Sequence, residues 1–122
     1  MDVRVIGEHP ALIAAVNNDE VIINDGQSAL DFMATLRYST DCDCILLNKA
    51  AICEDFFKLS TGIAGEVLQK FSNYRLKFAI VGDFSAYTSK PLKDFMFESN
   101  KGGTIIFAVD EDEAITKLGG SK

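Results

Sequence analysis

A hydroxyl pair directly before a glycine, Ser60-Thr61-Gly62, combines the residue types in this sequence best suited to a chemical switch. An apolar stripe of helical spacing follows it, so the pair is predicted to lie where a loop becomes a helix. Ser or Thr at that position can cap exposed backbone N–H groups, which is worth about 0.5–2 kcal/mol. A phosphate there would meet the same donors and the positive end of the helix dipole. Helix capping and regulated phosphorylation are therefore the two interpretations of Ser60 and Thr61.

Two predicted loops, 48–61 and 82–89, carry most of the other side chains that could form a site. Each follows an apolar strand, so we expect both at the carboxyl edge of a parallel sheet, where α/β proteins place functional loops. Each mixes polar with aromatic groups, as contact surfaces do, although the Phe residues could equally fill the core. The predicted partner or ligand surface consists of Asp55, Phe56, Gly62, Asp83, Phe84, Ser85 and Tyr87.

Groups for catalysis or metal binding are few. Glu54, Asp55 and Asp83 could do acid–base work if they converged, but turn and capping roles are commoner for such residues. Cys42 and Cys44 lie two apart on a predicted strand and would project to one face. The chain lacks Cys-x-x-Cys spacing and has a single histidine, so the two cysteines are better explained as small buried apolar residues than as metal ligands. We therefore predict no catalytic residue, no metal site and no cofactor.

Composition restricts the partners and the compartment. The chain has 122 residues, 48% hydrophobic, which predicts one domain over 1–118 and a frayed tail over 119–122. Its net charge of −6 argues against nucleic acid as a partner. No run approaches the roughly 20 apolar residues that cross a bilayer, no signal pattern opens the chain, and three cysteines do not suggest a disulfide framework. We expect a cytoplasmic protein without a membrane partner, whose apolar edge strands permit a homodimer.

The order of predicted elements is a hairpin followed by alternating helices and strands. Such alternation predicts an α/β fold with a mixed, mostly parallel sheet of about four to five strands, the hairpin supplying the antiparallel member. A short extended piece is expected at 21–23. Strands are predicted at 3–7, 11–16, 45–47, 78–81 and 105–109, and helices from Asn24-Asp25 to about Tyr38, from Ile63 to Phe71, behind a Ser89 cap, and from Asp110 with a Glu113 capping box.

This order resembles the STAS domain of anti-sigma-factor antagonists. The segment Phe57-Lys58-Leu59-Ser60-Thr61-Gly62-Ile63-Ala64 is similar to its switch motif, in which an Asp, two Ser, a Gly and an apolar residue open the second helix. In that family a partner kinase phosphorylates the hydroxyl residue directly before the Gly, which controls binding. The resemblance thus implies a STAS-like fold, a regulatory protein-binding role, and Thr61 as phosphoacceptor with Ser60 beside it. Leu59 stands in place of the family's Asp, Thr61 replaces a Ser, and the preceding loop is longer.

Residues 20–118 are also similar to a family of small bacterial proteins described as domain of unknown function 4180. That family brings no established activity. The matching stretches are Ile22-Ile23-Asn24-Asp25, Cys53-Glu54-Asp55-Phe56-Phe57, Leu68-Gln69-Lys70-Phe71, Ile80-Val81-Gly82-Asp83-Phe84-Ser85 and Phe97-Glu98-Ser99-Asn100-Lys101-Gly102.

Three classes of function remain open from the sequence. The leading one is a non-enzymatic regulatory module that docks an unknown protein partner and is switched by phosphorylation of Thr61 or Ser60. The alternative is a small-molecule or anion-binding domain that uses the same loops, with the backbone N–H groups of 61–64 facing the ligand. An enzyme is the weakest, because it requires Glu54, Asp55 or Asp83 to converge with a hydroxyl in a closed pocket.

Overall fold

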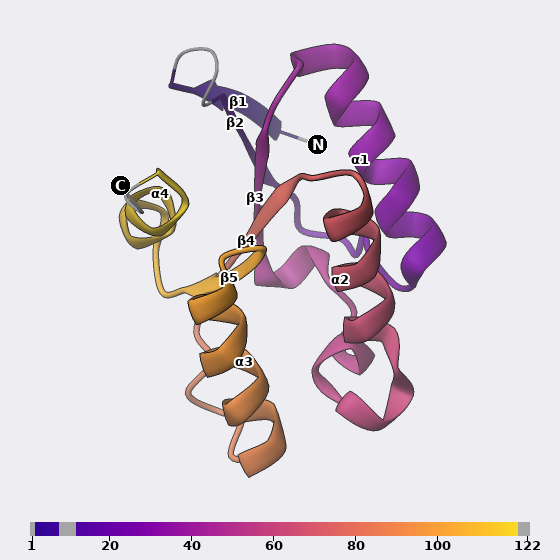
Figure 1. Ribbon diagram of the computed structural model, residues 1–122, viewed down its shortest axis with the longest axis vertical. Helices are drawn as coiled ribbons and strands as arrows, with labels where there is room; N and C mark the ends of the chain where they lie inside the picture. The colour runs from indigo at the N-terminus through magenta and orange to yellow at the C-terminus, as the bar shows by residue number, and fades with distance from the viewer. Residues whose placement is uncertain (1, 8–11, 120–122) are drawn as a thin grey trace.

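Five short apolar segments of the chain form one mixed sheet (Figure 1). The computed structural model describes residues 2–7 and 12–119, so the predicted turn at His9-Pro10 lies outside the described residues. The strands lie side by side in chain order, with β1 antiparallel to β2 and the other pairs parallel. This confirms the predicted α/β fold with an antiparallel hairpin strand. The strands are β1 (Asp2–Ile6), β2 (Ile13–Asn17), β3 (Cys44–Asn48), β4 (Lys77–Val81) and β5 (Ile105–Ala108).

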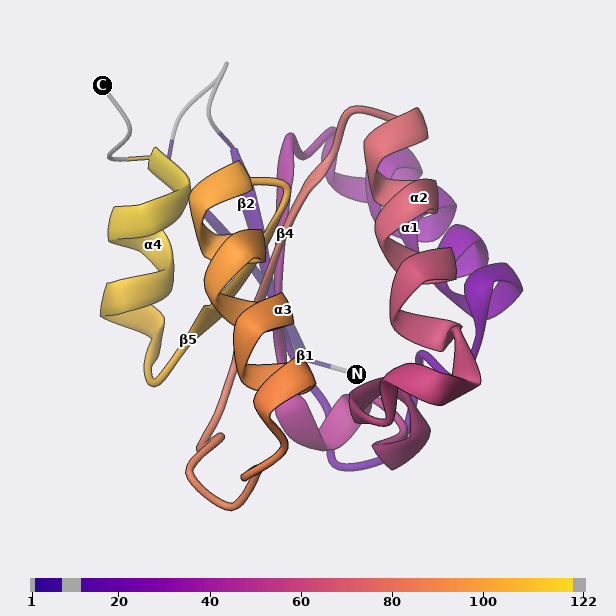
Figure 2. The same cartoon turned by 60° about the horizontal axis from the view of Figure 1, so that its bottom comes forward.

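The helices cover the sheet unequally because of this strand order. Each parallel crossover advances in the same direction, and right-handed connections then place every crossover helix on one face. The buried side chains of α1 (Gly26–Thr40), α2 (Ile63–Asn73) and α3 (Lys90–Gly102) accordingly share one core. The last helix, α4 (Glu111–Gly119), lies on the other side of the sheet from α1 and α2 (Figure 2). The described strand order never reverses, and such reversals are where open α/β sheets form ligand crevices.

Alternation along the strands separates two hydrophobic cores. The larger lies beneath the three crossover helices, and the smaller lies beneath α4, where Ala114 and Leu118 pack on the sheet. Strand β2 shows the alternation, since Ala14 and Val16 belong to the larger core whereas Ile13 and Ala15 belong to the smaller. The parallel strands are therefore buried on both faces, as their continuous apolar runs predict.

The prediction that Cys42 and Cys44 share one strand face is wrong. Strand β3 begins only at Cys44, and Cys42 precedes it, next to Asp41, which ends α1 in a left-handed conformation with φ 56°. Cys42 packs in the larger core and Cys44 in the smaller. Both thiols are free, and burial raises the pKa of each above its ordinary value of 9.0. They pack as small apolar groups on opposite faces of the sheet.

Local caps begin α1, α3 and α4 where the sequence predicts them. Asp25 caps α1 by accepting from the Ser28 N–H at 2.8 Å, and the Ser28 hydroxyl accepts in return from the Asp25 N–H at 3.0 Å. The Ser89 side chain caps α3. The Asp110 carboxylate accepts from the Glu113 N–H at 2.8 Å at the start of α4. These short-range bonds explain why the helix starts could be read from the sequence.

Helix α3 also protects the sheet edge that β5 leaves open. The Asn100 side chain accepts from the Phe107 N–H at 2.7 Å and donates to the Phe107 carbonyl at 3.4 Å. An unpaired strand edge offers such groups to other chains, so a side chain that pairs with them blunts the edge. Asn100 thus keeps the backbone groups of Phe107 from pairing with a strand of another chain.

Helix α2 ends in a Schellman motif built on an unusual residue. The Leu76 N–H donates to the Phe71 carbonyl at 3.0 Å and the Arg75 N–H to the Ser72 carbonyl at 3.1 Å. Arg75 occupies the left-handed position of this motif with φ 57°, where glycine is normally favoured. The arginine side chain therefore resides at a strained position of the backbone.

Replacing Arg75 with glycine is expected to raise the free energy of unfolding by about 0.5–1 kcal/mol, because glycine adopts positive φ without a Cβ clash. Urea denaturation measures this change. The matched control is Gln69→Gly at an exposed helical position of α2, where glycine should instead cost about 0.5 kcal/mol. Equal losses from both substitutions would contradict the strain at Arg75.

Candidate functional site

The carboxyl ends of β3 and β4 bring the two predicted loops together. Asn48 lies opposite Val81 in the parallel register, so Lys49 and Gly82 leave the sheet next to each other. A β-carbon at Gly82 would lie 2.6 Å from the Lys49 Cβ, which is too close for any side chain there. Glycine at position 82 thus makes room for the Lys49 side chain at the end of β4.

Lys49 is the centre of a polar group that we call the rim cluster: Lys49, Glu54, Asp83 and Tyr87. The Lys49 Nζ lies 3.7 Å from the Glu54 Oε1 and 5.0 Å from the centre of the Tyr87 ring. The Tyr87 hydroxyl donates to the Glu54 Oε2 at 2.7 Å. Lys49 is absent from the predicted surface, although its place directly after a buried strand, at the first residue of the 3-10 turn η1 (Lys49–Ala51), was a usable signal.

Aromatic side chains form the base of the rim cluster. The Phe57 and Tyr87 rings stack with centres 4.9 Å apart, and the Phe84 ring lies 6.0 Å from Phe57. Phe84 and Tyr87 are half-buried, so they are open to contact in part. Phe56, in the 3-10 turn η2 (Glu54–Phe57), is 0% exposed, and its assignment to a partner surface is therefore wrong. Packing against Phe57 and the larger core takes Phe56 out of reach of any partner.

The surroundings of Lys49, Tyr87 and Asp83 shift the pKa of each side chain away from pH 7. The Tyr87 hydroxyl, followed by Glu54, raises the pKa of Lys49 above its ordinary value of 10.5. Burial and the hydrogen bond to Glu54 raise the pKa of Tyr87 above 10.0. Hydrogen bonds from Ser85 lower the pKa of Asp83. A general acid or base works best when its pKa lies near the working pH, so these three side chains are poorly suited to proton transfer at pH 7.

Stability is expected to fall as the pH rises through about 10 and above. The folded-state pKa values of Tyr87 and Lys49 exceed their ordinary values of 10.0 and 10.5, so their contribution is complete below those values and is lost as pH rises through the folded values. Unfolding measured by urea between pH 8 and pH 11.5 would show this decline. Tyr87→Phe removes the tyrosine proton and the bond to Glu54, so its profile should be flatter and its stability at pH 7 lower by about 0.5–1 kcal/mol. A wild-type profile identical to that of Tyr87→Phe would contradict the assignment.

The hydroxyl pair lies just ahead of α2 and does not cap it. Gly62 is the N-cap residue, with φ 79° and no side-chain cap bond, and the 3-10 turn η3 (Leu59–Thr61) precedes it. The Thr61 hydroxyl lies 2.8 Å from the Asp55 carbonyl and 2.8 Å from the Lys58 carbonyl, so its proton is directed back into the loop. Its oxygen accepts only a long bond of 3.3 Å from the Ile63 N–H. The capping interpretation of the pair is therefore wrong, because an extra residue separates Thr61 from the helical hydrogen bonds.

Several residues at this edge are exposed to solvent, as a contact surface requires. Ser60, Thr61 and Gly62 are all exposed, and the Ser60 hydroxyl makes no hydrogen bond to a described residue. Asp55 is exposed as well and forms an ion pair with Lys58 at 3.6 Å. These groups lie on η2, η3 and the start of α2, which contact one another.

Two of the three acidic candidates, Glu54 and Asp83, approach Lys49, whereas Asp55 pairs with Lys58. Glu54 pairs with Lys49, and the field of Lys49 also contributes to the lowered pKa of Asp83. The Asp83 carboxylate itself accepts from the Ser85 N–H at 2.9 Å, which closes the turn after β4. Across residues 2–7 and 12–119, no three His, Cys, Asp or Glu side chains are grouped as a metal ion would need.

Bonds between distant segments fix the position of this edge. Asn18 and Asn48 exchange hydrogen bonds of 2.9 and 2.7 Å between the ends of β2 and β3. Ile23 and Ile52 form a parallel bridge beyond those strands. The Glu66 carboxylate of α2 accepts from the Gly26 N–H of α1 at 3.1 Å. The loops that carry the rim cluster are thus anchored on both sides.

Within the described part of the chain, none of the helices has both the length and the apolar character of a membrane span.

Comparison with other proteins identifies the chain's relatives only at the family level. No curated protein and no solved structure matches the chain. A family model does match over residues 8–118, and the chain therefore belongs to the family described as Domain of unknown function (DUF4180).

Proposed function

We propose that this protein is a non-enzymatic regulatory module that docks a protein partner through its carboxyl-edge surface. That surface consists of the rim cluster together with Asp55, Ser60, Thr61, Gly62, Phe84 and Ser85. The observation that carries the proposal is the rim cluster itself, in which the half-buried Lys49 and the exposed carboxylates of Glu54 and Asp83 lie over stacked aromatic rings. Aromatic groups bordered by ordered polar groups are typical of protein interfaces.

The chemistry of the cluster supports binding over catalysis. Lys49 stays protonated and Tyr87 neutral at pH 7, so neither is prepared to exchange a proton with a substrate. A groove of about 500 Å³ is lined by residues of α1 and of the segment after α2 and not by the rim cluster. An open polar surface fits a macromolecular partner better than a small substrate, which usually occupies a concave pocket.

The regulatory part of the proposal is phosphorylation at Thr61 or Ser60, as in the STAS-type anti-sigma-factor antagonists of bacteria. Both residues are exposed within the carboxyl-edge surface. A phosphate on Thr61 would replace the proton that points at two carbonyls, and so would release η3 from η2. It would add a charge of about −1.5 to −2 close to Asp55. We propose that this combination of added charge and altered loop position ends partner binding, in the cytoplasm where the free thiols remain reduced.

Affinity purification of partners with the full chain, followed by binding measurements on purified components, tests this function. We expect Thr61→Asp to weaken partner binding at least tenfold, whereas Thr61→Asn, which has a similar shape and no charge, should weaken it much less. Ser60→Asp and Ser60→Asn form the second pair. If neither Asp variant differs from its Asn control, the phosphorylation switch is contradicted.

Docking at the rim has its own test. Asp83→Lys reverses an exposed charge of the rim cluster and removes the turn bond from the Ser85 N–H, so partner binding should fall while the free energy of unfolding falls by only about 0.5–1 kcal/mol. Lys93→Glu, a charge reversal of an exposed residue on α3, is the control. Equal binding by both variants would remove the rim from the interface.

An anion-binding domain is the second candidate function, favoured by the uncapped start of α2. Gly62 gives this helix no side-chain cap, and the Ile63 N–H donates only a long bond of 3.3 Å to the Thr61 hydroxyl, so the N–H groups of Ala64 and Gly65 are available to an anion. A thermal-shift screen with nucleotides and acidic metabolites distinguishes this function, since a ligand at 100 times its Kd stabilises the fold by about 2.7 kcal/mol. Stabilisation that survives Asp83→Lys but is lost in Thr61→Asp would favour anion binding at α2 over docking at the rim.

A further inference from the structure

The two edge strands of the sheet differ in how their outer backbone groups are covered. In β5 the Asn100 side chain occupies the N–H and carbonyl of Phe107. Strand β1, at the opposite border of the sheet, pairs with β2 alone among the described elements (Figure 1). Every second residue of an antiparallel edge strand directs its N–H and carbonyl away from its neighbour. The outer side of β1 therefore offers these groups to an added strand.

The side chains of β1 alternate between charged and apolar groups. Val3 is half-buried and Val5 is 51% exposed, and the register with β2 places both on the face of the larger core. Asp2 and Arg4 are exposed and lie on the other face, the one that α4 packs against. An apolar pair and a pair of opposite charges thus share one strand of five residues.

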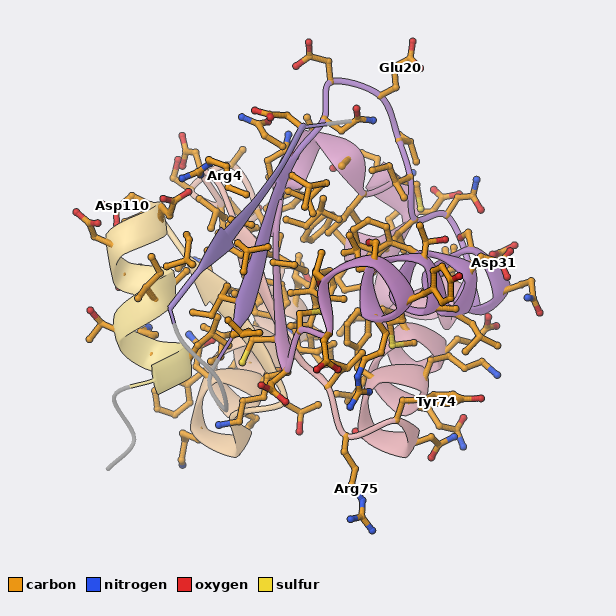
Figure 3. All side chains as sticks on the ribbon, turned by 90° about the horizontal axis from the view of Figure 1, so that it is seen from above. Arg4, Glu20, Asp31, Tyr74, Arg75 and Asp110 are labelled. Carbon is orange, nitrogen blue, oxygen red and sulfur yellow. The ribbon has the colours of Figure 1, made fainter. Side chains whose placement is uncertain are left out.

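The Arg4 side chain is held in place at the start of α4. Its Nη1 and Nη2 donate to the two carboxylate oxygens of Glu111. Figure 3 shows Arg4 beside the beginning of α4, on the same side of the molecule as Asp110. A guanidinium has five N–H donors, so an arginine that already binds one carboxylate can bind a second. Arg4 is therefore prepared to pair with a carboxylate beyond the edge of the sheet.

The sequence of β1 complements a second copy of itself. When two copies pair antiparallel about a twofold axis at Val3, Asp2 of each copy lies opposite Arg4 of the other. The two Val3 side chains then face each other, and each Val5 lies diagonal to the other copy's Val3. A register centred on Arg4 would bring like charges together, and one centred on Val5 would place Arg4 opposite the apolar Ile6. Opposite charges stabilise such pairs, so charge selects the register centred on Val3.

We propose that this protein forms a symmetric homodimer in which β1 pairs antiparallel with β1 of a second copy, in the register centred on Val3. The two sheets then become one continuous sheet that ends in β5 of each copy, where Asn100 occupies the Phe107 backbone. A surface that pairs with itself closes after two copies, so no longer assembly follows. Because β1 is short, the contact area is small and the dimer is weak. The rim cluster lies at the ends of β3 and β4 and takes no part in this pairing.

Sedimentation velocity of the full chain over a range of concentrations tests the dimer. We expect a monomer–dimer equilibrium without larger species. Asp2→Lys and Arg4→Asp should each raise the dimer Kd about tenfold or more, because each places like charges opposite each other twice. Lys93→Glu, an exposed charge reversal on α3, should leave the Kd unchanged. A wild-type chain that stays monomeric at high concentration, or one Kd shared by all four proteins, would overturn the proposal.

An equimolar mixture of the Asp2→Lys and Arg4→Asp chains tests the register. In the mixed dimer one chain supplies two cations and the other two carboxylates, so both charge pairs are restored. We expect the mixture to dimerise with an affinity close to that of the wild type, whereas each variant alone stays largely monomeric. Arg4→Asp also loses the ion pair with Glu111, so circular dichroism is used to verify its fold. A mixture that is no more dimeric than its components would overturn the proposal.

Disulfide trapping tests the same register without a change of charge. Directly opposed residues of antiparallel strands have Cβ atoms about 4.5–5.5 Å apart, near the spacing within a disulfide. Val3→Cys should therefore cross-link into a dimer on mild oxidation. Val5→Cys should not, because position 5 does not face itself in this register. The wild-type chain, in which Cys42 and Cys44 are buried, is the background control. Cross-linking through position 5 alone, or through neither position, would overturn the proposal.

Two further outcomes separate this dimer from other contacts. Thr61→Asp should leave the dimer Kd unchanged, so failure of the phosphorylation switch and failure of the dimer are distinguishable. An extended peptide of a partner protein could add to the same edge of the sheet. A chain that is monomeric alone and binds such a peptide along β1 would replace the second copy as occupant and overturn the proposal.

Discussion

Replacing Phe71 with alanine is expected to lower the free energy of unfolding by about 3–5 kcal/mol. Phe71 projects from α2 into the larger core and is 0% exposed. Its ring stacks on Phe78 of β4 with centres 4.3 Å apart and planes 6° apart, so the substitution removes both apolar burial and this contact. For a domain of this size the loss is a large fraction of a total stability of about 5–15 kcal/mol. Urea denaturation monitored by circular dichroism measures it.

The control for Phe71→Ala is the same substitution at Phe97. That ring lies on α3, is 63% exposed and contacts the Lys101 ammonium at 5.1 Å. Phe97→Ala should change stability by no more than about 0.5 kcal/mol, because little apolar surface is re-exposed. Similar losses for the two variants would contradict the packing of α2 against β4. An unfolded Phe71→Ala protein, next to a folded Phe97→Ala protein, agrees with the prediction.

Gly82→Ala is the second large effect, and we expect it to cost about 1–3 kcal/mol. The new β-carbon would lie 2.6 Å from the Lys49 Cβ. That atom is bonded directly to the backbone and cannot rotate away, so the end of β3 or the turn after β4 must move. The movement should separate Lys49 from Tyr87 and Glu54 and thereby weaken partner binding at the rim. Thermal denaturation and partner titration measure the two consequences.

Gly65→Ala provides the comparison for Gly82→Ala. Gly65 lies inside α2, and an added β-carbon would meet nothing within 4 Å. Alanine there should raise stability by about 0.5–1 kcal/mol through its higher helix propensity. Opposite signs for the two substitutions would establish crowding at Gly82 as the cause. Stabilisation by both would mean that Lys49 does not occupy the space beside Gly82.

The sequence by itself determined the elements of this fold. Continuous apolar runs predicted the parallel strands, since strands buried on both faces need no alternation. Asp25, Ser89 and Asp110 predicted helix starts because each bonds to an N–H group three residues ahead, within reach of its own side chain. Alternation of helices and strands then predicted the mixed sheet. All of these signals depend on neighbours in the chain.

Only the tertiary structure decided which side chains form the surface. The sequence could not distinguish the buried Phe56 from the half-buried Phe84, because both are Phe in polar loops. It also could not show that Cys42 lies before β3. Nor could it show that α2 begins one residue later than a Thr61 cap requires, with Gly62 as its N-cap residue. Lys49 meets Glu54 and Tyr87 only because β3 and β4 pair in register and Gly82 leaves space. Burial and long-range pairing depend on residues that are distant in the chain, so no local pattern encodes them.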